Sequence, residues 1–227
     1  MRSFLRSSVL AALCALAAPA QDAPIDPDGV AGTRLLAGGG RLPAVVTERF
    51  VALARTAAGG PPRIVLMPTA SASADEPGND ERLLGRWREE HPDATFSVLH
   101  TRDRARSDAA DFVAPLTTAH GVWLGGGAQE KLASAYVGTR VEAELQALLQ
   151  RGGVIAGTSA GTAIQTRTMI QEGRDPPVLA RGFDFVPDAI SDQHFLRRDR
   201  LPRLLQALTL APGHFGIGVD EGTALLV

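Results

Sequence analysis

The run Gly153-Val154-Ile155-Ala156-Gly157-Thr158-Ser159-Ala160-Gly161 sets the expected architecture of this chain. Its apolar first half predicts a buried strand, and the glycines that follow predict a sharp turn into a helix. The pattern Gly157-x-Ser159-x-Gly161 fits a nucleophile elbow, a turn that raises a serine hydroxyl off the end of a sheet. The two glycines have no Cβ, so the turn can be tight and the helix can pack closely. A glycine-rich turn can also carry a serine by chance, so a catalytic Ser159 requires partners elsewhere in the chain.

Apolar strands alternate with amphipathic helices on the N-terminal side of this run. An unbroken apolar strand is typical of a sheet buried on both faces, and the capping box Thr139-Arg140-Val141-Glu142 is typical of a helix start. The expected strands are 34–37, 63–68, 96–99 and 120–124, and the expected helices are 43–55, 81–91, 107–118 and one that begins after Thr139. The alternation predicts an α/β fold with a parallel sheet between helical layers. Ligands of such sheets bind beyond the carboxyl ends of the strands, where 125–129 and Ser159 are both expected.

The length and the N-terminal composition predict one domain behind an export signal. A chain of 227 residues, 44% of them hydrophobic, suits a single sizeable domain. Residues 1–20 combine Arg2 and Arg6, an apolar run and an Ala18-Pro19-Ala20 cleavage pattern, as secretory signals do. We therefore expect cleavage after Ala20, a secreted or periplasmic location, a flexible segment 21–33 and one domain over 34–227. The sequence stops inside an expected strand, which suggests truncation at the C-terminus with an edge strand left unpaired.

Charge and cysteine content narrow the possible partners. Without Arg2 and Arg6, 21 of the 23 basic residues remain against 25 acidic ones, which argues against a nucleic-acid partner. The apolar run near the N-terminus is too short for a stable membrane span. The one cysteine, Cys14, lies inside the predicted signal, so the mature chain would depend on core burial without disulfides.

A serine nucleophile needs a base within hydrogen-bond reach and an acid that orients this base. The candidate bases are His91, His100, His120, His194 and His214. His194 stands out because polar groups surround it, in Ser191-Asp192-Gln193-His194, at the end of a short apolar run. The acid can be Asp192, which an extended backbone would point the same way as His194, or Glu221 at the end of another short strand. Spacing alone leaves this choice open.

Four segments, taken together, resemble the cyanophycinase-like branch of the S51 serine peptidases, the family that includes aspartyl dipeptidase (peptidase E). They are Gly125-Gly126-Gly127-Ala128-Gln129, Gly157-Thr158-Ser159-Ala160-Gly161, Asp192-Gln193-His194-Phe195 with the arginines after it, and 216–224. The segments occupy roughly the second half of the chain. Their combination is far more specific than any one of them.

The resemblance implies a three-layer α/β/α sandwich similar to class I glutamine amidotransferases, with serine in place of their cysteine. It implies Ser159 as nucleophile, His194 as base and Glu221 as the residue that orients His194. It also suggests backbone oxyanion donors at Gly127 and Ala160. The residues that it suggests for substrate binding are Gln129, Asp192, Gln193, Arg200 and Arg203. The two arginines would hold substrate carboxylates, and Asp192 is a candidate contact for a substrate guanidinium.

The expected reaction is hydrolysis of an amide beside an aspartyl residue through an acyl-enzyme on Ser159, with no metal or organic cofactor. Cyanophycin, an aspartate backbone with arginine on its side chains, is the favoured substrate, and β-Asp-Arg dipeptides are the expected product. Three alternatives remain open: a dipeptidase for small aspartyl or isoaspartyl peptides, a non-catalytic peptide-binding homologue, and an esterase that uses Ser159, Asp188 and His214. The resemblance also suggests a homodimer.

Overall fold

The computed structural model describes residues 31–227. The predicted signal peptide, 1–20, and all but the last residues of the segment 21–33 lie outside the described residues. The first strand begins at Thr33, so the end of the segment that we expected to be flexible is part of the sheet. Within 31–227 no helix combines the length and apolar character that crossing a bilayer requires.

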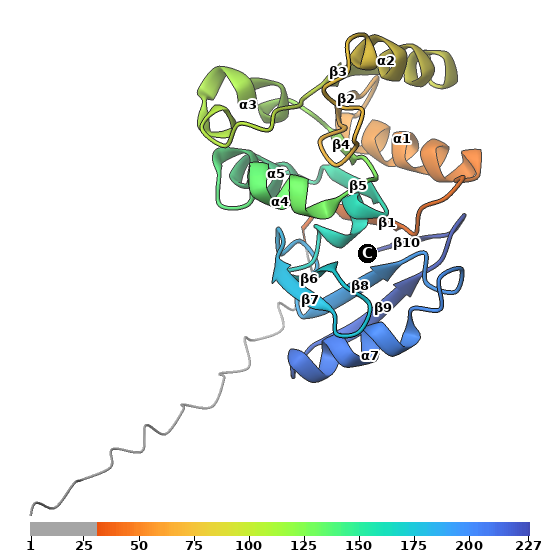
Figure 1. Ribbon diagram of the computed structural model, residues 1–227. Helices are drawn as coiled ribbons and strands as arrows, with labels where there is room; N and C mark the ends of the chain where they lie inside the picture. Colours follow the sequence, from red (N-terminus) through yellow and green to blue (C-terminus); the bar gives the residue numbers. More distant parts are fainter. Residues whose placement is uncertain (1–30) are drawn as a thin grey trace, which may run out of the picture. The chain divides into compact units, whose positions relative to one another are not determined.

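A six-stranded sheet forms the centre of the described domain (Figure 1). Its strands lie in the order β10-β1-β5-β4-β2-β3, and every pair is parallel except β10 with β1. The bounds are β1 (Thr33–Ala37), β2 (Arg63–Met67), β3 (Thr95–Val98), β4 (Gly121–Leu124), β5 (Val154–Thr158) and β10 (Ala224–Leu226). The parallel strands therefore direct their carboxyl ends to one edge, as the alternation in the sequence predicts.

Helices cover both faces of this sheet because neighbouring residues of each strand point to opposite sides. On one face, Ile64 and Ala156 pack with α1 (Ala44–Ala58) and α2 (Asn79–Glu90). On the other, Val65 and Ile155 pack against a second layer of helices. That layer contains α3 (Ala110–Thr117), α4 (Gln129–Tyr136) and α5 (Arg140–Gln150). The 3₁₀ turn η1 (Arg106–Asp108) comes just before α3. Figure 1 shows the two helical layers and the sheet between them.

A second group of elements follows the nucleophile turn and the short helix α6 (Ala160–Ala163). It consists of the antiparallel pair β6 (Thr168–Glu172) and β7 (Val178–Arg181), the parallel pair β8 (Ala189–Gln193) and β9 (Phe215–Val219), and α7 (Leu201–Leu210). β8 and β9 flank α7 in the chain, so they form a small parallel unit with α7 packed on it. A backbone hydrogen bond connects this unit to the central sheet: the His194 N–H donates to the carbonyl of Gly38, just after β1 (2.9 Å).

One helix was not predicted, and one local expectation was wrong. The sequence Gln129–Tyr136 has only a weak apolar stripe and so gave little signal for helix α4. The capping box at α5 does not form: the Thr139 hydroxyl donates to the Tyr136 carbonyl, and the Glu142 carboxylate accepts the N–H of Gly138 instead of that of Thr139. Glu142 also pairs with Arg181 (3.0 Å) on β7. Glu142 therefore connects α5 with β7, and this tertiary contact takes the place of the local capping interaction.

Candidate active site

Ser159 lies at the sharp turn between β5 and α6, at the carboxyl edge of the central sheet. Its backbone has φ 51° and ψ −110°, a combination that a non-glycine residue rarely adopts. The flanking glycines allow this turn: a Cβ on Gly157 would come within 2.0 Å of the Gly161 carbonyl oxygen, and one on Gly161 within 2.1 Å of the Leu124 carbonyl oxygen. Only glycine fits at either position, so the local sequence sets the elbow.

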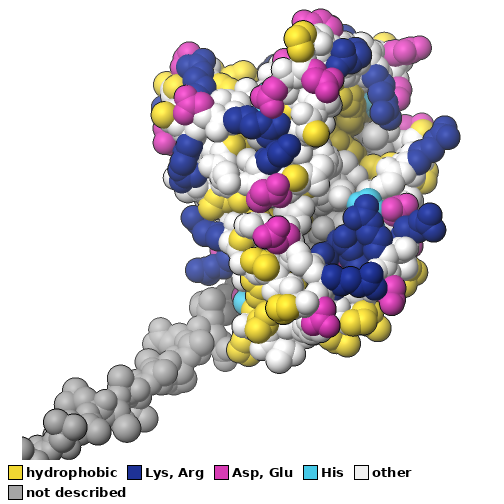
Figure 2. Space-filling model, viewed as in Figure 1, with side chains coloured by type: hydrophobic (Ala, Val, Ile, Leu, Met, Phe, Trp, Pro, Cys, Tyr) yellow, Lys and Arg dark blue, Asp and Glu magenta, His cyan; other side chains and the backbone are white. Residues whose placement is uncertain are grey.

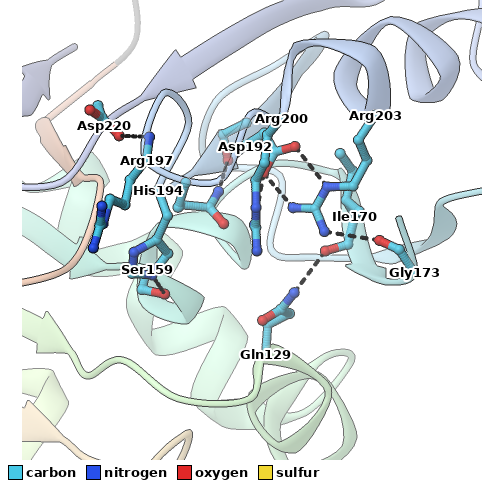
Figure 3. Close-up of polar contacts among 12 residues, drawn as sticks. Gln129, Ser159, Ile170, Gly173, Asp192, His194, Arg197, Arg200, Arg203 and Asp220 are labelled. Carbon is cyan, nitrogen blue, oxygen red and sulfur yellow. Dashed lines mark hydrogen bonds and ion pairs between the residues drawn. The ribbon is translucent and has the colours of Figure 1, made fainter. Parts of the chain in front are cut away.

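A continuous chain of hydrogen bonds connects the serine to a carboxylate. Ser159 Oγ lies 2.8 Å from His194 Nε2, and His194 Nδ1 lies 2.6 Å from Glu221 Oε1. A carboxylate only accepts, so the imidazole proton is on Nδ1 and Nε2 accepts the serine proton. His194 is 10% exposed and Glu221 is 32% exposed at the side chain. Figure 3 shows Ser159 and His194 pointing toward each other.

The parallel pairing of β8 with β9 explains why Glu221 and not Asp192 contacts the base. Gln193 at the end of β8 lies opposite Val219 at the end of β9, so the residues that follow each strand meet at one edge. His194 has a φ of 53°, which breaks the alternation that would have placed it on the same side as Asp192. The acid that spacing left undecided is therefore identified by the geometry.

The alternative set of Ser159, Asp188 and His214 is not brought together. His214 Nε2 lies 3.1 Å from the Thr168 hydroxyl, and its Nδ1 lies 3.2 Å from the Ala211 carbonyl. Asp188 and His214 precede β8 and β9, so they lie at the amino ends of the strands whose carboxyl ends carry His194 and Glu221. The esterase triad is therefore wrong.

Two backbone amides are available beside the serine. Among residues 31–227, neither the Gly127 N–H nor the Ala160 N–H donates a backbone hydrogen bond. Ala160 is the first residue of α6, and Gly127, with φ 139°, lies against the loop after β2, where a Cβ would meet the Ala70 carbonyl at 2.1 Å. Free amides at a strand-to-helix turn are the groups that stabilise an oxyanion.

The glycine loop Gly38-Gly39-Gly40 follows β1 and lies against the catalytic side chains. A Cβ on Gly39 would come within 2.5 Å of His194 Cε1 and 3.1 Å of Ser159 Cβ, and one on Gly40 within 2.8 Å of Glu221 Oε2. The loop therefore approaches the imidazole and the carboxylate with backbone alone. Three consecutive glycines after a strand are a signal that could have found it.

Asp192 does not line an open substrate site, contrary to the expectation. It is fully buried, and its carboxylate accepts from Arg203 Nε (2.8 Å) and Nη2 and from Arg200 Nη1 (3.0 Å). Arg203 also donates to the Gly173 carbonyl (3.0 Å), and burial and then the nearby Arg203 charge lower the pKa of Arg200. Figure 3 shows this cluster. Arg203 is thus held by both Asp192 and Gly173, whereas Arg200 contributes only Nη1 to Asp192.

We expect Asp192→Asn to destabilise the fold, because it leaves the buried Arg203 guanidinium without its counter-charge. Removing one partner of a buried ion pair costs about 3–5 kcal/mol. The free energy of unfolding from urea denaturation measures the effect. Asp199→Asn is the matched control, because Asp199 is 82% exposed at the side chain and its nearest cation, Arg174, is 4.0 Å away. A loss at Asp192 no larger than at Asp199 would contradict the buried-pair assignment.

The two predicted glutamines have different positions. Gln129 is half-buried, and its Nε2 donates to the carbonyls of Ile170 (2.8 Å) and Gln171 (2.6 Å), which fixes the start of α4 to β6. Its Oε1 has no hydrogen bond within the described residues and can still face a ligand. Gln193 is buried and donates to the Ser191 hydroxyl (3.0 Å), so its amide is held inside the domain.

Exposed arginines occur instead just after His194. Arg197 and Arg198 are exposed, and neither side chain has a hydrogen bond or ion pair within residues 31–227. The Arg197 N–H donates to Asp220 Oδ1 (2.9 Å), which places this residue next to Glu221 and lowers the pKa of Asp220. Figure 2 shows a group of basic side chains beside a hollow, with a histidine at its edge. These two arginines are exposed cations near the catalytic candidates that the sequence did not suggest for substrate binding.

A polar cluster holds the loop after β2, which packs against Gly127 and Ala128. His100 lies between the Thr69 hydroxyl (2.9 Å) and the Asp75 carboxylate (3.0 Å), and Arg102 binds both Asp75 (2.7 Å) and the Thr69 carbonyl (2.6 Å). This cluster fixes the loop whose Ala70 carbonyl accepts the Ala128 N–H (3.0 Å). The sequence contained no signal for it, because its members come from two separate loops.

Comparisons with known proteins identify the family of this chain. The model of peptidase family S51 matches residues 35–227. A cyanophycinase from Nostoc sp. (strain PCC 7120) is 34% identical over 169 residues, which cover 70% of this chain and 55% of the relative. A cyanophycinase from Synechococcus elongatus is 33% identical over 137 residues, 57% of this chain and 42% of the relative. The chain thus spans about half the length of the curated relatives it matches.

Two solved structures share the fold. A peptidase from an acI-B1 actinobacterium superposes with a TM-score of 0.71 at 24% identity, over 87% of this chain and 84% of that one. A putative peptidase E protein from Listeria monocytogenes superposes with a TM-score of 0.58 at 14% identity, over 87% and 94%. The described domain therefore has the class I glutamine amidotransferase-like sandwich of these proteins. With the family model matched from β1 to the last residue, this chain belongs to peptidase family S51, a family of serine peptidases.

Proposed function

We propose that this protein is an exported serine peptidase that hydrolyses aspartyl-linked peptides, and that cyanophycin is its substrate. The observation that carries the catalytic part is the hydrogen-bonded chain Ser159–His194–Glu221 beside two unused amides. The export part rests on the signal-like composition of residues 1–20. The substrate part rests on the names of the relatives and on the exposed arginines beside the site.

In the proposed reaction, Ser159 Oγ attacks the carbonyl carbon of the scissile amide while His194 Nε2 takes its proton. The carbonyl oxygen becomes an oxyanion that accepts from the amides of Gly127 and Ala160. His194 then gives the proton to the leaving amine, and the C–N bond breaks to leave an acyl-enzyme. Water, activated by the same imidazole, attacks the ester and restores the serine. Glu221 keeps the imidazole in the productive tautomer and stabilises its cation.

The exposed arginines favour an acidic substrate. Arg197 and Arg198 follow the base directly, and both have their guanidinium groups free for carboxylates. In cyanophycin each aspartate side chain is joined to an arginine by an amide bond, so the carboxylate that each unit offers is that of its arginine. Arg203, which the sequence suggested for this role, is instead held by Asp192 and Gly173, and Arg200 donates to the same carboxylate.

The test is release of β-Asp-Arg dipeptide from insoluble cyanophycin by the purified protein, with Ser159→Ala in parallel. We expect release by the wild type alone. Labelling of Ser159 by a serine-directed phosphonate without release would keep the peptidase and discard cyanophycin, and small aspartyl and isoaspartyl dipeptides would be assayed next. Neither release nor labelling, in protein shown to be folded, would overturn the enzymatic function and favour a peptide-binding protein.

A further inference from the structure

A cavity of about 760 Å³ opens at the carboxyl edge of the sheet, between α1 and α2. Gly126 and Thr158 form the end nearest the nucleophile, since Thr158 precedes Ser159 and a Cβ on Gly126 would lie 3.6 Å from Ser159 Cβ. The cavity is therefore continuous with the reacting centre, although none of the substrate-binding residues expected from the sequence lines it. Its volume suits one or two amino-acid residues.

Aromatic side chains line the floor of this cavity. Trp87 from α2 and Trp123 from β4 lie with their ring centroids 5.2 Å apart, at an interplanar angle of 61°. Phe50 packs against both of them from below, at 6.1 Å and 5.4 Å. Trp87 and Trp123 are only 6% and 8% exposed, so they offer a small rigid apolar contact that suits the aliphatic stem of a long side chain.

The rim of the cavity carries charges that the protein leaves partly unused. Glu90 pairs with Arg86 (3.0 Å), whereas Glu48 on α1 has no hydrogen bond or ion pair within residues 31–227. Both carboxylates act electrostatically on His91, so they lie on the same side of the cavity. Burial lowers the pKa of His91, so a neutral imidazole does not offset Glu48. Arg41, at the end near the glycine loop, is likewise without a side-chain partner in the described part of the chain.

We propose that this cavity is the substrate subsite for an arginine residue, and this inference rests on the proposed peptidase function. The guanidinium binds at the rim between Glu48 and Glu90, the stem lies on Trp87 and Trp123, and the residue's own carboxylate faces Arg41. A planar guanidinium suits two neighbouring carboxylates better than an ammonium does, because its donors form a fork. The subsite supplies the acidic contact that buried Asp192 cannot supply.

The chain offers a direct optical test, because its two tryptophans are both in this cavity. Ser159→Ala, which cannot consume the ligand, is titrated with β-Asp-Arg and with β-Asp-citrulline, in which a neutral urea replaces the guanidinium. We expect a saturable change in tryptophan fluorescence with the arginine ligand and about tenfold weaker binding of the citrulline ligand, as for loss of a charged hydrogen bond.

Two variants in the Ser159→Ala background locate the contact. Glu48→Gln is expected to weaken binding of the arginine ligand about tenfold, to the level of the citrulline ligand. Glu89→Gln is the matched control, because Glu89 is exposed on the same helix as Glu90 but lies outside the cavity lining. Equal affinity for both ligands would overturn the inference. So would discrimination that survives in Glu48→Gln, or the absence of both a fluorescence change and a rise in melting temperature.

The titration tests the subsite and the release assay tests the proposed function, so either hypothesis can be contradicted without the other. Discrimination in the titration without release of dipeptide by the wild type would contradict the proposed substrate and leave the subsite in place. Release without discrimination would establish the peptidase and remove the subsite from this cavity.

Discussion

Ser159→Ala is expected to lower kcat by about a million-fold, the largest effect of any single change in this protein. The substitution removes the only atom that can form the acyl-enzyme and leaves the amides of Gly127 and Ala160 in place. Some acceleration over the uncatalysed reaction therefore remains, because such donors and substrate binding work without the nucleophile. Dipeptide release and phosphonate labelling both measure the loss.

The fold of this variant should be unaffected. Among residues 31–227 the Ser159 hydroxyl bonds to His194 only, and alanine keeps the Cβ that serine already has at φ 51°. The melting temperature of Ser159→Ala should therefore match that of the wild type. A variant that keeps more than about a hundredth of the wild-type kcat would exclude Ser159 as the nucleophile.

Glu221→Gln is expected to lower kcat by about ten thousand-fold with little change in KM. A glutamine amide can donate to His194 Nδ1, which moves the imidazole proton to Nε2. In that tautomer Nε2 cannot accept the serine proton. KM should stay near its wild-type value because Glu221 contacts the base and not the space beside the serine.

Asp220→Asn is the matched control for this experiment. Asp220 precedes Glu221, and its Oδ1 accepts the Arg197 N–H, which an asparagine oxygen can also accept. We therefore expect kcat to change by less than about fivefold, a fraction of what loss of a full hydrogen bond would cost. If both variants lost activity equally, the effect would come from charge near the site and not from the imidazole tautomer.

The local parts of this fold were predictable from the sequence. The alternation of strands and helices predicted the parallel sheet, and the glycines on either side of Ser159 predicted the elbow, because in each case neighbouring residues determine the structure. The two glycine positions illustrate this: the atoms that exclude a Cβ there belong to the same turn or to the strand beside it.

The acid and the arginines were not predictable from spacing, because they depend on pairing between distant strands. Asp192 and His194 would share a side in an extended strand, but the positive φ of His194 ends the alternation. Arg203, eleven residues after Asp192 in the chain, donates to the Asp192 carboxylate from α7. No local pattern encodes the burial of the Asp192–Arg203 ion pair, so the sequence could not distinguish this buried arginine from the exposed Arg197 and Arg198.

The residues of the catalytic chain come from two different sheets. The six-stranded sheet carries Ser159 and the proposed oxyanion donors Gly127 and Ala160, whereas the small β8–β9 unit carries the proposed base and acid, His194 and Glu221. Proton transfer therefore depends on how these two bodies dock, through contacts such as that of His194 N–H with Gly38. A small shift between the two sheets would lengthen the 2.8 Å contact between Ser159 Oγ and His194 Nε2. We therefore expect activity to be lost at a lower denaturant concentration than the circular dichroism signal of secondary structure.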